Sequence, residues 1–400
     1  MATQLIHSDV ARIASFELNL LNYSKALPKA ALEGAALEAG TPIYDTNGEI
    51  LFYRFPLSQN GCPAGYADVA AHSIFGAPLL AVSPSSVWDE QAIVEAAREA
   101  FLAHAREKPP FHDYDEIRIV AYSYPKIAVQ FLHEKKEVAM LECYTWINVP
   151  HAHAKTAAHK PLEVSHFERW SLIDGLPPEV AEQNHKKFEA RIALGGQPEF
   201  SGLDQRLISS AAIVPIIPIV LSESWEVHYN PISTSHHPCF ELKGQETNVW
   251  CVVASTQMLL DFYRYNYTQT KIAQQLGLGT PTSPIGLPYS RVGDVVTQLQ
   301  VMSSNALTAQ MITSPTFADF TSELKQNRPM ISFIPGHSRA VAGYTWTSPI
   351  LPTGFSGLLV YDPWPPTPLP TPNTGGVITR WENFATQTYQ YAYKAKVHTI

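Results

Sequence analysis

Residues 244–263 read GQETNVWCVVASTQMLLDFY, and the interpretation of the whole chain starts from this stretch. From Cys251 onward, apolar residues such as Val252 and Leu259 recur at the spacing of an amphipathic helix. The predicted helix runs from Cys251 to about Arg264, so the cysteine stands in its first turn. The positive end of the helix dipole favours a thiolate there. Cys251 is therefore a candidate nucleophile.

Gln245 lies six residues before this cysteine. When a thiolate attacks a carbonyl group it creates an oxyanion, which has to be stabilised by fixed hydrogen-bond donors. The side-chain amide of Gln245 can supply one donor, and the backbone N–H of Cys251 can supply another. Thr247 and Asn248 are candidate caps for the helix that follows.

A base and an orienting group are expected elsewhere in the sequence. His337, in IPGHSRAVAGY, falls between two predicted strands, and Gly336 leaves room beside it. Asp362, in LLVYDPWPP, closes the strand after that and can fix the tautomer of an imidazole by accepting its proton. Trp364 follows two residues later and is a candidate for shielding the pair from water.

The order Gln-x5-Cys, His and Asp-Pro-Trp resembles the papain-like clan of cysteine peptidases, and the bacterial C39-like and staphopain-like group most of all. The resemblance covers residues 241–400 and implies a papain-like domain that acts on a peptide or protein without metal or cofactor. Carried over, it implies four roles: the oxyanion hole for Gln245, the nucleophile for Cys251, the base for His337 and the orienting group for Asp362.

Two positions depart from the pattern of the clan. Many members have asparagine at the position of Asp362, although the C39-like ones use aspartate. Many have glycine after the nucleophile, whereas Val252 follows here and could narrow the substrate cleft.

The first 200 residues predict a second α+β region. Residues 1–40 read as two helices, one capped by Ser8 and ending near Leu21, the other running from Pro28 to Gly40. Strands then flank the turns Asn47-Gly48 and Asn60-Gly61, a helix with a capping box at Ser86 and Asp89 spans 85–108, and residues 116–149 read as a hairpin of two strands.

Four segments follow from this organisation. They are an N-terminal helical segment (1–40), an α+β domain (41–200), an extended segment and linker (201–240) and the peptidase-like domain (241–400). The predicted fold class is α+β. A smaller α+β domain comes first, and a papain-like C-terminal domain follows, in which the helices precede an antiparallel sheet.

The segments PIYDTNGEILFYRFPL and GYADVAA resemble strand pairs of propeptides in this group. The resemblance implies a zymogen whose N-terminal half inhibits or chaperones the active site.

Composition narrows the partners. The formal net charge is −8 and the basic residues are not clustered, which disfavours a nucleic-acid partner. No apolar run reaches the roughly 20 residues that span a bilayer, and the N-terminus lacks a secretory signal pattern. Four cysteines, at 62, 143, 239 and 251, are too few for a disulfide scaffold. A cytoplasmic location, or export without a classical signal peptide, is expected.

Several alternatives stay open at this level. His151, His153 and His159 could suggest a metal site, but they lack carboxylate or cysteine partners nearby. His236 and His237 beside Cys239 are more suggestive of one, although a solvated linker is the default interpretation there. Cys62 or Cys239 could form a redox latch with Cys251. A transglutaminase-like acyl transferase, or a non-catalytic binding protein on the same scaffold, would share the Cys–His–Asp order.

Overall fold

The computed structural model describes residues 4–27, 32–84, 88–107, 113–149, 169–195, 208, 222–227, 240–347, 355–366 and 378–398. The chain divides into two compact units. By its described residues, the N-terminal unit contains the chain up to Ser222, with Thr347 and Phe355. The C-terminal unit contains Glu223–Trp346 and the described residues from Ser356 onward. Each unit combines helices with a sheet, which confirms the α+β class. The predicted boundaries at 40, 200 and 240 remain predictions.

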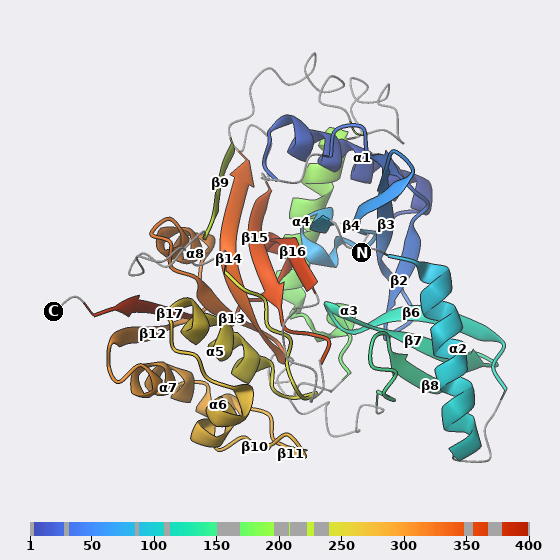
Figure 1. Cartoon of the computed structure of the whole chain (residues 1–400). Coiled ribbons are helices and arrows are strands. Elements are labelled where there is room, and N and C mark those ends of the chain that lie inside the picture. Colours follow the sequence, from blue (N-terminus) through green and yellow to red (C-terminus); the bar gives the residue numbers. More distant parts are fainter. Residues whose placement is uncertain are drawn as a thin grey trace. The chain divides into compact units, whose positions relative to one another are not determined.

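The sheet of the N-terminal unit has the order β5-β4-β3-β2-β6-β7-β8, and β1 also pairs with β3 (Figure 1). Among these pairs β2 and β6 are parallel and the others antiparallel. The strands are β1 (Ala36–Leu37), β2 (Thr41–Asp45), β3 (Ile50–Gln59), β4 (Cys62–Ala70), β5 (Leu79–Pro84), β6 (Glu116–Ser123), β7 (Lys126–His133) and β8 (Lys136–Glu142).

Two of the predicted turns are confirmed, whereas the hairpin of two strands predicted for 116–149 is wrong, because the structure has three strands there and the last of them, β8, ends at Glu142. Asn47-Gly48 joins β2 to β3, and Asn60-Gly61 joins β3 to β4. Residues 116–133 do not form one arm of a hairpin, because the chain turns at Tyr124-Pro125 and makes two strands, β6 and β7. The proline there has no N–H to donate to a ladder, so it suits the turn.

The helices of this unit are α1 (His7–Tyr23), α2 (Glu90–Glu107), α3 (Leu172–Gly175) and α4 (Pro178–Gly195), with a short 3-10 helix η1 (Ser73–Phe75). The predicted helix ending near Leu21 is confirmed as α1, but Ser8 does not cap it, because its N-cap is Ile6. For α2, Asp89 accepts from the backbone N–H of Ala92 at 3.0 Å, while Ser86 lies outside the described residues.

A helix from 28 to 40 was expected, and over the described residues 32–40 that expectation is wrong. Gly34 has φ +75°, a left-handed conformation that ends a helical path. Its backbone N–H donates to the carbonyl of Ile208 at 2.8 Å, and Ile208 donates to Ala35 at 2.9 Å. This pairing with a distant segment replaces the local hydrogen bonds that a helix would make.

The sheet of the C-terminal unit has the order β12-β17-β13-β14-β15-β16, and these neighbouring strands are antiparallel. Here β9 pairs with β14 beyond the point where the β13 ladder ends. The strands are β9 (Ser222–Glu226), β12 (Leu307–Thr313), β13 (Met330–Ile334), β14 (His337–Thr347), β15 (Ser356–Asp362), β16 (Ile378–Asn383) and β17 (Tyr391–Val397), with a separate two-stranded ribbon of β10 (Gly279–Thr280) and β11 (Ser283–Pro284).

Its helices are α5 (Cys251–Phe262), α6 (Gln269–Leu276), α7 (Asp294–Met302) and α8 (Phe317–Leu324), with 3-10 helices η5 (Tyr289–Arg291) and η6 (Phe384–Thr386). The sequence pattern predicts all four α-helices, at 251–264, 268–276, 291–302 and 315–327, to within a few residues at their ends. It predicts five strands as well, at 330–334, 340–346, 357–362, 377–381 and 389–397, whereas β9, β12 and the ribbon strands β10 and β11 were missed.

One continuous apolar core joins these helices to the sheet. It includes Leu259 of α5, Ile272 of α6, Leu299 of α7, Ile331 of β13 and Tyr393 of β17, all fully buried. Full burial of each large apolar side chain contributes roughly 1.5–3 kcal/mol. The core therefore fixes α5, and with it the position of Cys251, against the strands.

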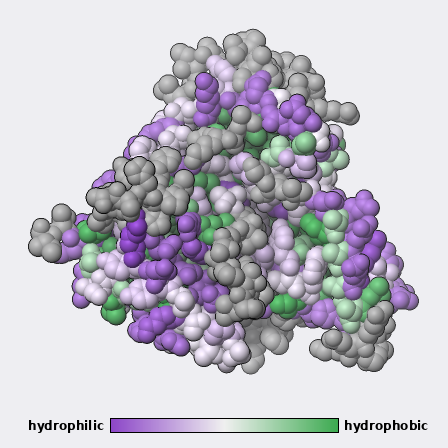
Figure 2. Space-filling view, viewed as in Figure 1, coloured by the Kyte–Doolittle hydropathy of each residue, from purple (hydrophilic) through white to green (hydrophobic). Residues whose placement is uncertain are grey.

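The surface of the described helices is mixed in character. Figure 2 shows hydrophilic side chains gathered over α2, whose Ala97 and Phe101 are buried on its inner face.

Within the described part of the chain, no helix has both the length and the apolar character that crossing a membrane requires.

Candidate active site

Cys251 is the first residue of α5, as predicted, and it is buried. The helix is preceded by Trp250, and no side chain caps it, so the prediction of a cap from Thr247 or Asn248 is wrong. Trp250 is fully buried, and its indole Nε1–H donates to the carbonyl of Leu278 at 3.0 Å. The start of the helix is thus anchored by a packed indole instead of a polar cap.

His337 is the first residue of β14 and is buried. It stands opposite Ile334 in the β13–β14 ladder, so Pro335 and Gly336 form a two-residue turn between the strands. Gly336 has φ +67°, a left-handed conformation that glycine adopts without strain. This conformation explains the glycine better than the expected need for space beside His337. The tight turn determines where the imidazole leaves the sheet.

Asp362 is the last residue of β15, and its side chain is buried beside His337. The ring nitrogen Nε2 of His337 lies 2.7 Å from Oδ1 of Asp362. The backbone N–H of Trp364 donates to the same oxygen at 3.0 Å. Because a carboxylate only accepts, Nε2 carries the proton, and the other ring nitrogen, Nδ1, is the one with base character.

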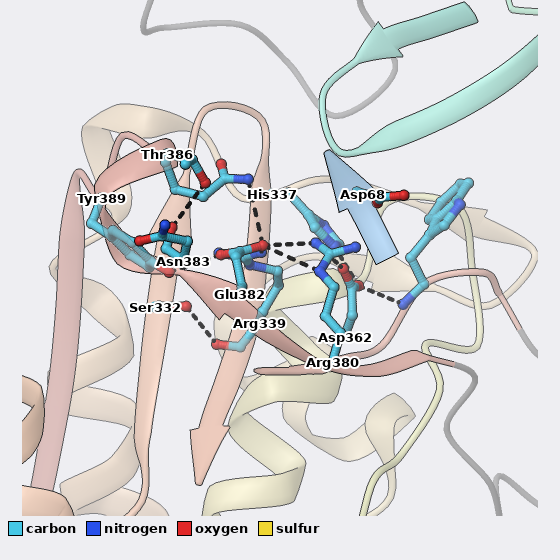
Figure 3. A network of polar contacts seen from close by, with 12 residues as sticks. Asp68, Ser332, His337, Arg339, Asp362, Arg380, Glu382, Asn383, Thr386 and Tyr389 are labelled. Atoms are coloured by element: carbon cyan, nitrogen blue, oxygen red, sulfur yellow. Dashed lines mark hydrogen bonds and ion pairs between the residues drawn. The ribbon is translucent and has the colours of Figure 1, made fainter. Parts of the chain in front are cut away.

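Two arginines and a second carboxylate lie behind Asp362 (Figure 3). Arg380 of β16 has its Nη2 3.9 Å from Oδ2 of Asp362, and Arg339 lies on β14. Burial alone would raise the pKa of Asp362, but the interaction with His337 and the two arginine charges hold it well below its usual range. Asp362 is therefore ionised at neutral pH.

Gln245 is fully buried and is tied to the same segment as Asp362. Its backbone N–H donates to the carbonyl of Pro363 at 2.9 Å, and its side-chain Nε2 donates to the carbonyl of Thr247 at 2.5 Å. The Thr247 carbonyl also receives the backbone N–H of Trp250, at 3.5 Å. Hydrogen bonds thus lead from the residue before Cys251, through Gln245, to the segment that carries Asp362.

Gln269, on α6, was not identified from the sequence. Its side-chain Nε2 donates to the carbonyl of Gly244 at 2.8 Å, and its Oε1 accepts from the N–H of Glu246 at 2.9 Å. One buried amide therefore holds both peptide groups that flank Gln245. Gln269 directly follows the helix cap Thr268, and no local pattern distinguishes it from an exposed glutamine.

The remaining predicted residues have different outcomes. Trp364 is buried, and its role as a shield stays a prediction. Cys62 is exposed, and Cys143 is buried, which raises the pKa of its thiol. The histidines at 151, 153, 159, 236 and 237, and Cys239, lie outside the described residues. Within the ranges that the structure describes, no group of three His, Cys, Asp or Glu residues could hold a metal ion.

Comparison with known proteins bears on the C-terminal part of the chain. Residues 238–395 match the Peptidase_C39 like family. No curated protein matches the chain. The peptidase domain of Streptococcus ComA, a bi-functional ABC transporter involved in a quorum sensing pathway, is 16% identical, with 40% of this chain and 99% of that chain covered and a TM-score of 0.27.

A second solved structure, UfSP from C. elegans, is 13% identical, with 47% of this chain and 37% of that chain covered and a TM-score of 0.28. These structural likenesses are weak, and the family match is what confirms the predicted C39-like group. The staphopain-like and propeptide-like resemblances remain predictions. The C-terminal part of the chain, residues 238–395, is a peptidase C39-like domain.

Proposed function

We propose that the C-terminal unit is a cysteine peptidase in which Cys251 is the nucleophile, His337 the base and Asp362 the orienting group. The observation that carries the proposal is the buried 2.7 Å contact between His337 Nε2 and Asp362 Oδ1, which leaves Nδ1 as the basic nitrogen. The match to the C39-like family supports the class of reaction and a peptide or protein substrate.

The first half of the reaction forms an acyl-enzyme. Nδ1 of His337 takes the proton of the Cys251 thiol, and the thiolate attacks the carbonyl carbon of the scissile peptide. The resulting oxyanion receives hydrogen bonds from the N–H of Cys251 and from the second hydrogen of the Gln245 amide. When the C–N bond breaks, the imidazolium gives its proton to the leaving amine, and a thioester remains on Cys251.

The second half hydrolyses the thioester. His337 takes a proton from water as the hydroxyl oxygen attacks the thioester carbonyl, and the same donors stabilise the new oxyanion. The C–S bond then breaks, the carboxylic acid leaves, and the proton on His337 returns to the thiolate. Asp362 stays ionised throughout and stabilises the imidazolium. Trp364, two residues on, would limit the access of water to the His337–Asp362 pair.

We propose further that the chain is made as a zymogen whose N-terminal unit inhibits the peptidase. The support is the resemblance of residues 42–57 and 65–71 to the strand pairs of propeptides. The test compares the hydrolysis of an unstructured protein by the full chain with that by a chain beginning at Ser222. Equal rates would exclude inhibition by the N-terminal unit.

The peptidase proposal itself is tested by thiol alkylation with iodoacetamide at pH 6, mapped by mass spectrometry. An activated thiolate reacts at this pH, whereas an ordinary thiol with a pKa near 8.5 reacts slowly. We expect fast labelling of Cys251 in the shortened chain, whereas the exposed Cys62 of the full chain, which serves as the control, should be labelled slowly. The His337→Asn variant should lose the fast labelling.

Hydrolysis assays complete the test. The Cys251→Ala variant should be inactive, and Cys62→Ser should retain full activity. Gln245→Ala should lower kcat by roughly 10²–10³, the effect typical of losing one oxyanion donor. Full peptidase activity in Cys251→Ala would rule the proposal out.

A further inference from the structure

The charged side chains behind Asp362 all lie on one face of the sheet. His337, Arg339 and Val341 are every second residue of β14, so they lie on the same face of the strand. Val341 stands opposite Val360. Val360 is two residues from Asp362 and stands opposite Arg380. Since opposed residues point to the same side of an antiparallel sheet, this register gathers the charges on a single face.

Glu382 is the centre of this group, and it is fully buried. Its carboxylate accepts two hydrogen bonds from Arg339, at 2.7 and 2.9 Å, and one from the hydroxyl of Tyr389 at 2.8 Å. It also accepts from Nε and Nη2 of Arg380, at 3.2 and 2.9 Å. Figure 3 shows Arg380 directed at Glu382 on one side and beside Asp362 on the other.

The charges of the cluster balance. Arg339 and Arg380 carry two positive charges, and Asp362 and Glu382 carry two negative ones. A buried carboxylate facing only a neutral imidazole would pay a large desolvation penalty or become protonated. Arg380 offsets that penalty for Asp362, and Glu382 offsets the charge of Arg380 in turn.

The distances indicate why Arg380 does not bind Asp362 directly. Nε and Nη2 of Arg380 both donate to Glu382, and Nη2 lies 3.9 Å from Oδ2 of Asp362, which is beyond hydrogen-bond distance. At that distance the positive charge still favours the ionised carboxylate. Oδ1 meanwhile remains bound to His337 and to the N–H of Trp364.

We propose that Arg380, held in place by Glu382, is a positioning residue that keeps Asp362 ionised and directed at His337. The proposal rests on the function proposed above, because the pair is useful only if His337 acts as a base. It also explains how this chain can use aspartate at a position where many papain-like enzymes have asparagine. The groups that face Asp362 are His337 and Arg339 from β14 and Arg380 from β16.

The test removes the charge of Arg380 in the full chain. In Arg380→Gln and Arg380→Met, Glu382 keeps its bonds to Arg339 and Tyr389, so either variant that folds carries the test. Because loss of a nearby cation raises the pKa of every neighbouring group, the titration of the His337 ring should move up by about one pH unit. Arg380→Lys, which keeps the charge, should move it by less than half as much.

The readout is the NMR titration of the His337 ring carbon in histidine-labelled protein, assigned with His337→Asn. The matched control is Arg328→Gln, which breaks an arginine–glutamate pair of the same unit, Arg328–Glu323 at 2.6 Å. An upward shift in the neutral variants that is absent from this control supports the proposal. An unchanged titration in a folded neutral variant overturns it.

The pH profile of hydrolysis separates this inference from the proposed function. In an active enzyme, both limbs of the kcat/KM profile should move up by about one unit in Arg380→Gln, whereas a merely structural defect would lower the rate at every pH. If Cys251→Ala remains active, the proposed function fails. The His337 titration then still decides whether Arg380 controls the His337–Asp362 pair.

Discussion

The two units each bury an arginine–glutamate pair, and the two pairs have hydrogen bonds of the same lengths in different surroundings. In the N-terminal unit, Arg191 of α4 binds Glu17 of α1 through two hydrogen bonds of 2.7 and 2.9 Å. In the C-terminal unit, Arg339 binds Glu382 through two bonds of the same lengths. Both pairs are almost fully excluded from solvent.

The difference lies in what each pair is connected to. In the described part of the N-terminal unit, the further contact found for Arg191 is the ring of Phe16, 5.6 Å away, and the pair joins two helices. Glu382 binds a second arginine as well, and that arginine lies beside the carboxylate that contacts His337. An arginine–glutamate pair is thus a structural link between helices in the N-terminal unit, and a pair of the same type is part of the candidate active site in the C-terminal unit.

The largest effect should come from removing the carboxylate of either pair. Glu382→Leu leaves two buried arginines without their shared anion, and Glu17→Leu leaves one. Breaking a buried ion pair in this way costs about 3–5 kcal/mol, so we expect Glu382→Leu at the upper end of that range and Glu17→Leu at the lower end.

Urea denaturation measures the loss, and hydrogen exchange followed by mass spectrometry assigns it to a unit. Protection should fall in the strands of the C-terminal unit for Glu382→Leu, and in α1 and α4 for Glu17→Leu. Equal losses for the two variants would show that the second arginine adds nothing to the role of Glu382.

Replacing both partners together should separate the pairs by function. Well-packed apolar residues can replace a buried ion pair at little cost, so Arg191→Met with Glu17→Leu should change the stability by no more than about 1–2 kcal/mol. Arg339→Met with Glu382→Leu removes the carboxylate that holds Arg380 in place beside Asp362. We expect a kcat/KM at least about tenfold lower, corresponding to about 1.4 kcal/mol in the barrier.

The measurement is hydrolysis of a protein substrate by each double variant, with circular dichroism as the check on folding. A folded Arg339→Met, Glu382→Leu variant with the activity of the unaltered chain would make this pair as purely structural as the one in the N-terminal unit.

The four residues of the proposed catalytic set were all named from local sequence, because each stands next to a local signal. Cys251 opens a helix with clear apolar periodicity, and Asp362 ends an apolar strand just before a proline. The next helix was predicted from Thr268, which caps α6, and from Gly277, which ends it with φ +65°. Such signals depend on neighbours in the chain and need no knowledge of the tertiary fold.

The residues that support this set could not be named in the same way. Gln269, Arg380 and Glu382 are buried polar residues, and in the sequence they look like the exposed residues that such types usually are. Their partners lie on other strands or helices, so only the register of the sheet brings them together. The missed strands β9 and β12 have the same cause, since each pairs with a strand distant in sequence.

The dependence of stability on acid pH should also show how the charges of Arg339 and Arg380 act on Asp362 of the candidate active site. The pKa of Asp362 is held below its usual value in the folded chain, so its contribution to stability is present above pH 4 and is lost as the pH falls through the folded pKa. Asp362→Asn should therefore cost about 1–2 kcal/mol at pH 7 and progressively less below pH 4.

Urea denaturation of the unaltered chain and of Asp362→Asn at pH 7, 5 and 3.5 measures this difference. The two higher pH values should give the same gap between the proteins, and the lowest a smaller one. A gap that grows toward acid would mean that Asp362 binds protons more readily when folded, contrary to its charge surroundings.

The smallest effect on activity should come from removing the outermost donor of the cluster around Glu382. Tyr389→Phe removes one hydroxyl from Glu382, which keeps its four bonds to the two arginines. The loss of one such bond to a buried carboxylate should cost about 1–3 kcal/mol of stability, while kcat/KM changes less than about twofold because Arg380 keeps its place. Stability is read by urea denaturation and activity by hydrolysis. A tenfold fall in kcat/KM would show that the donors of Glu382 act on the site as one set, and would extend the functional cluster outward to Tyr389.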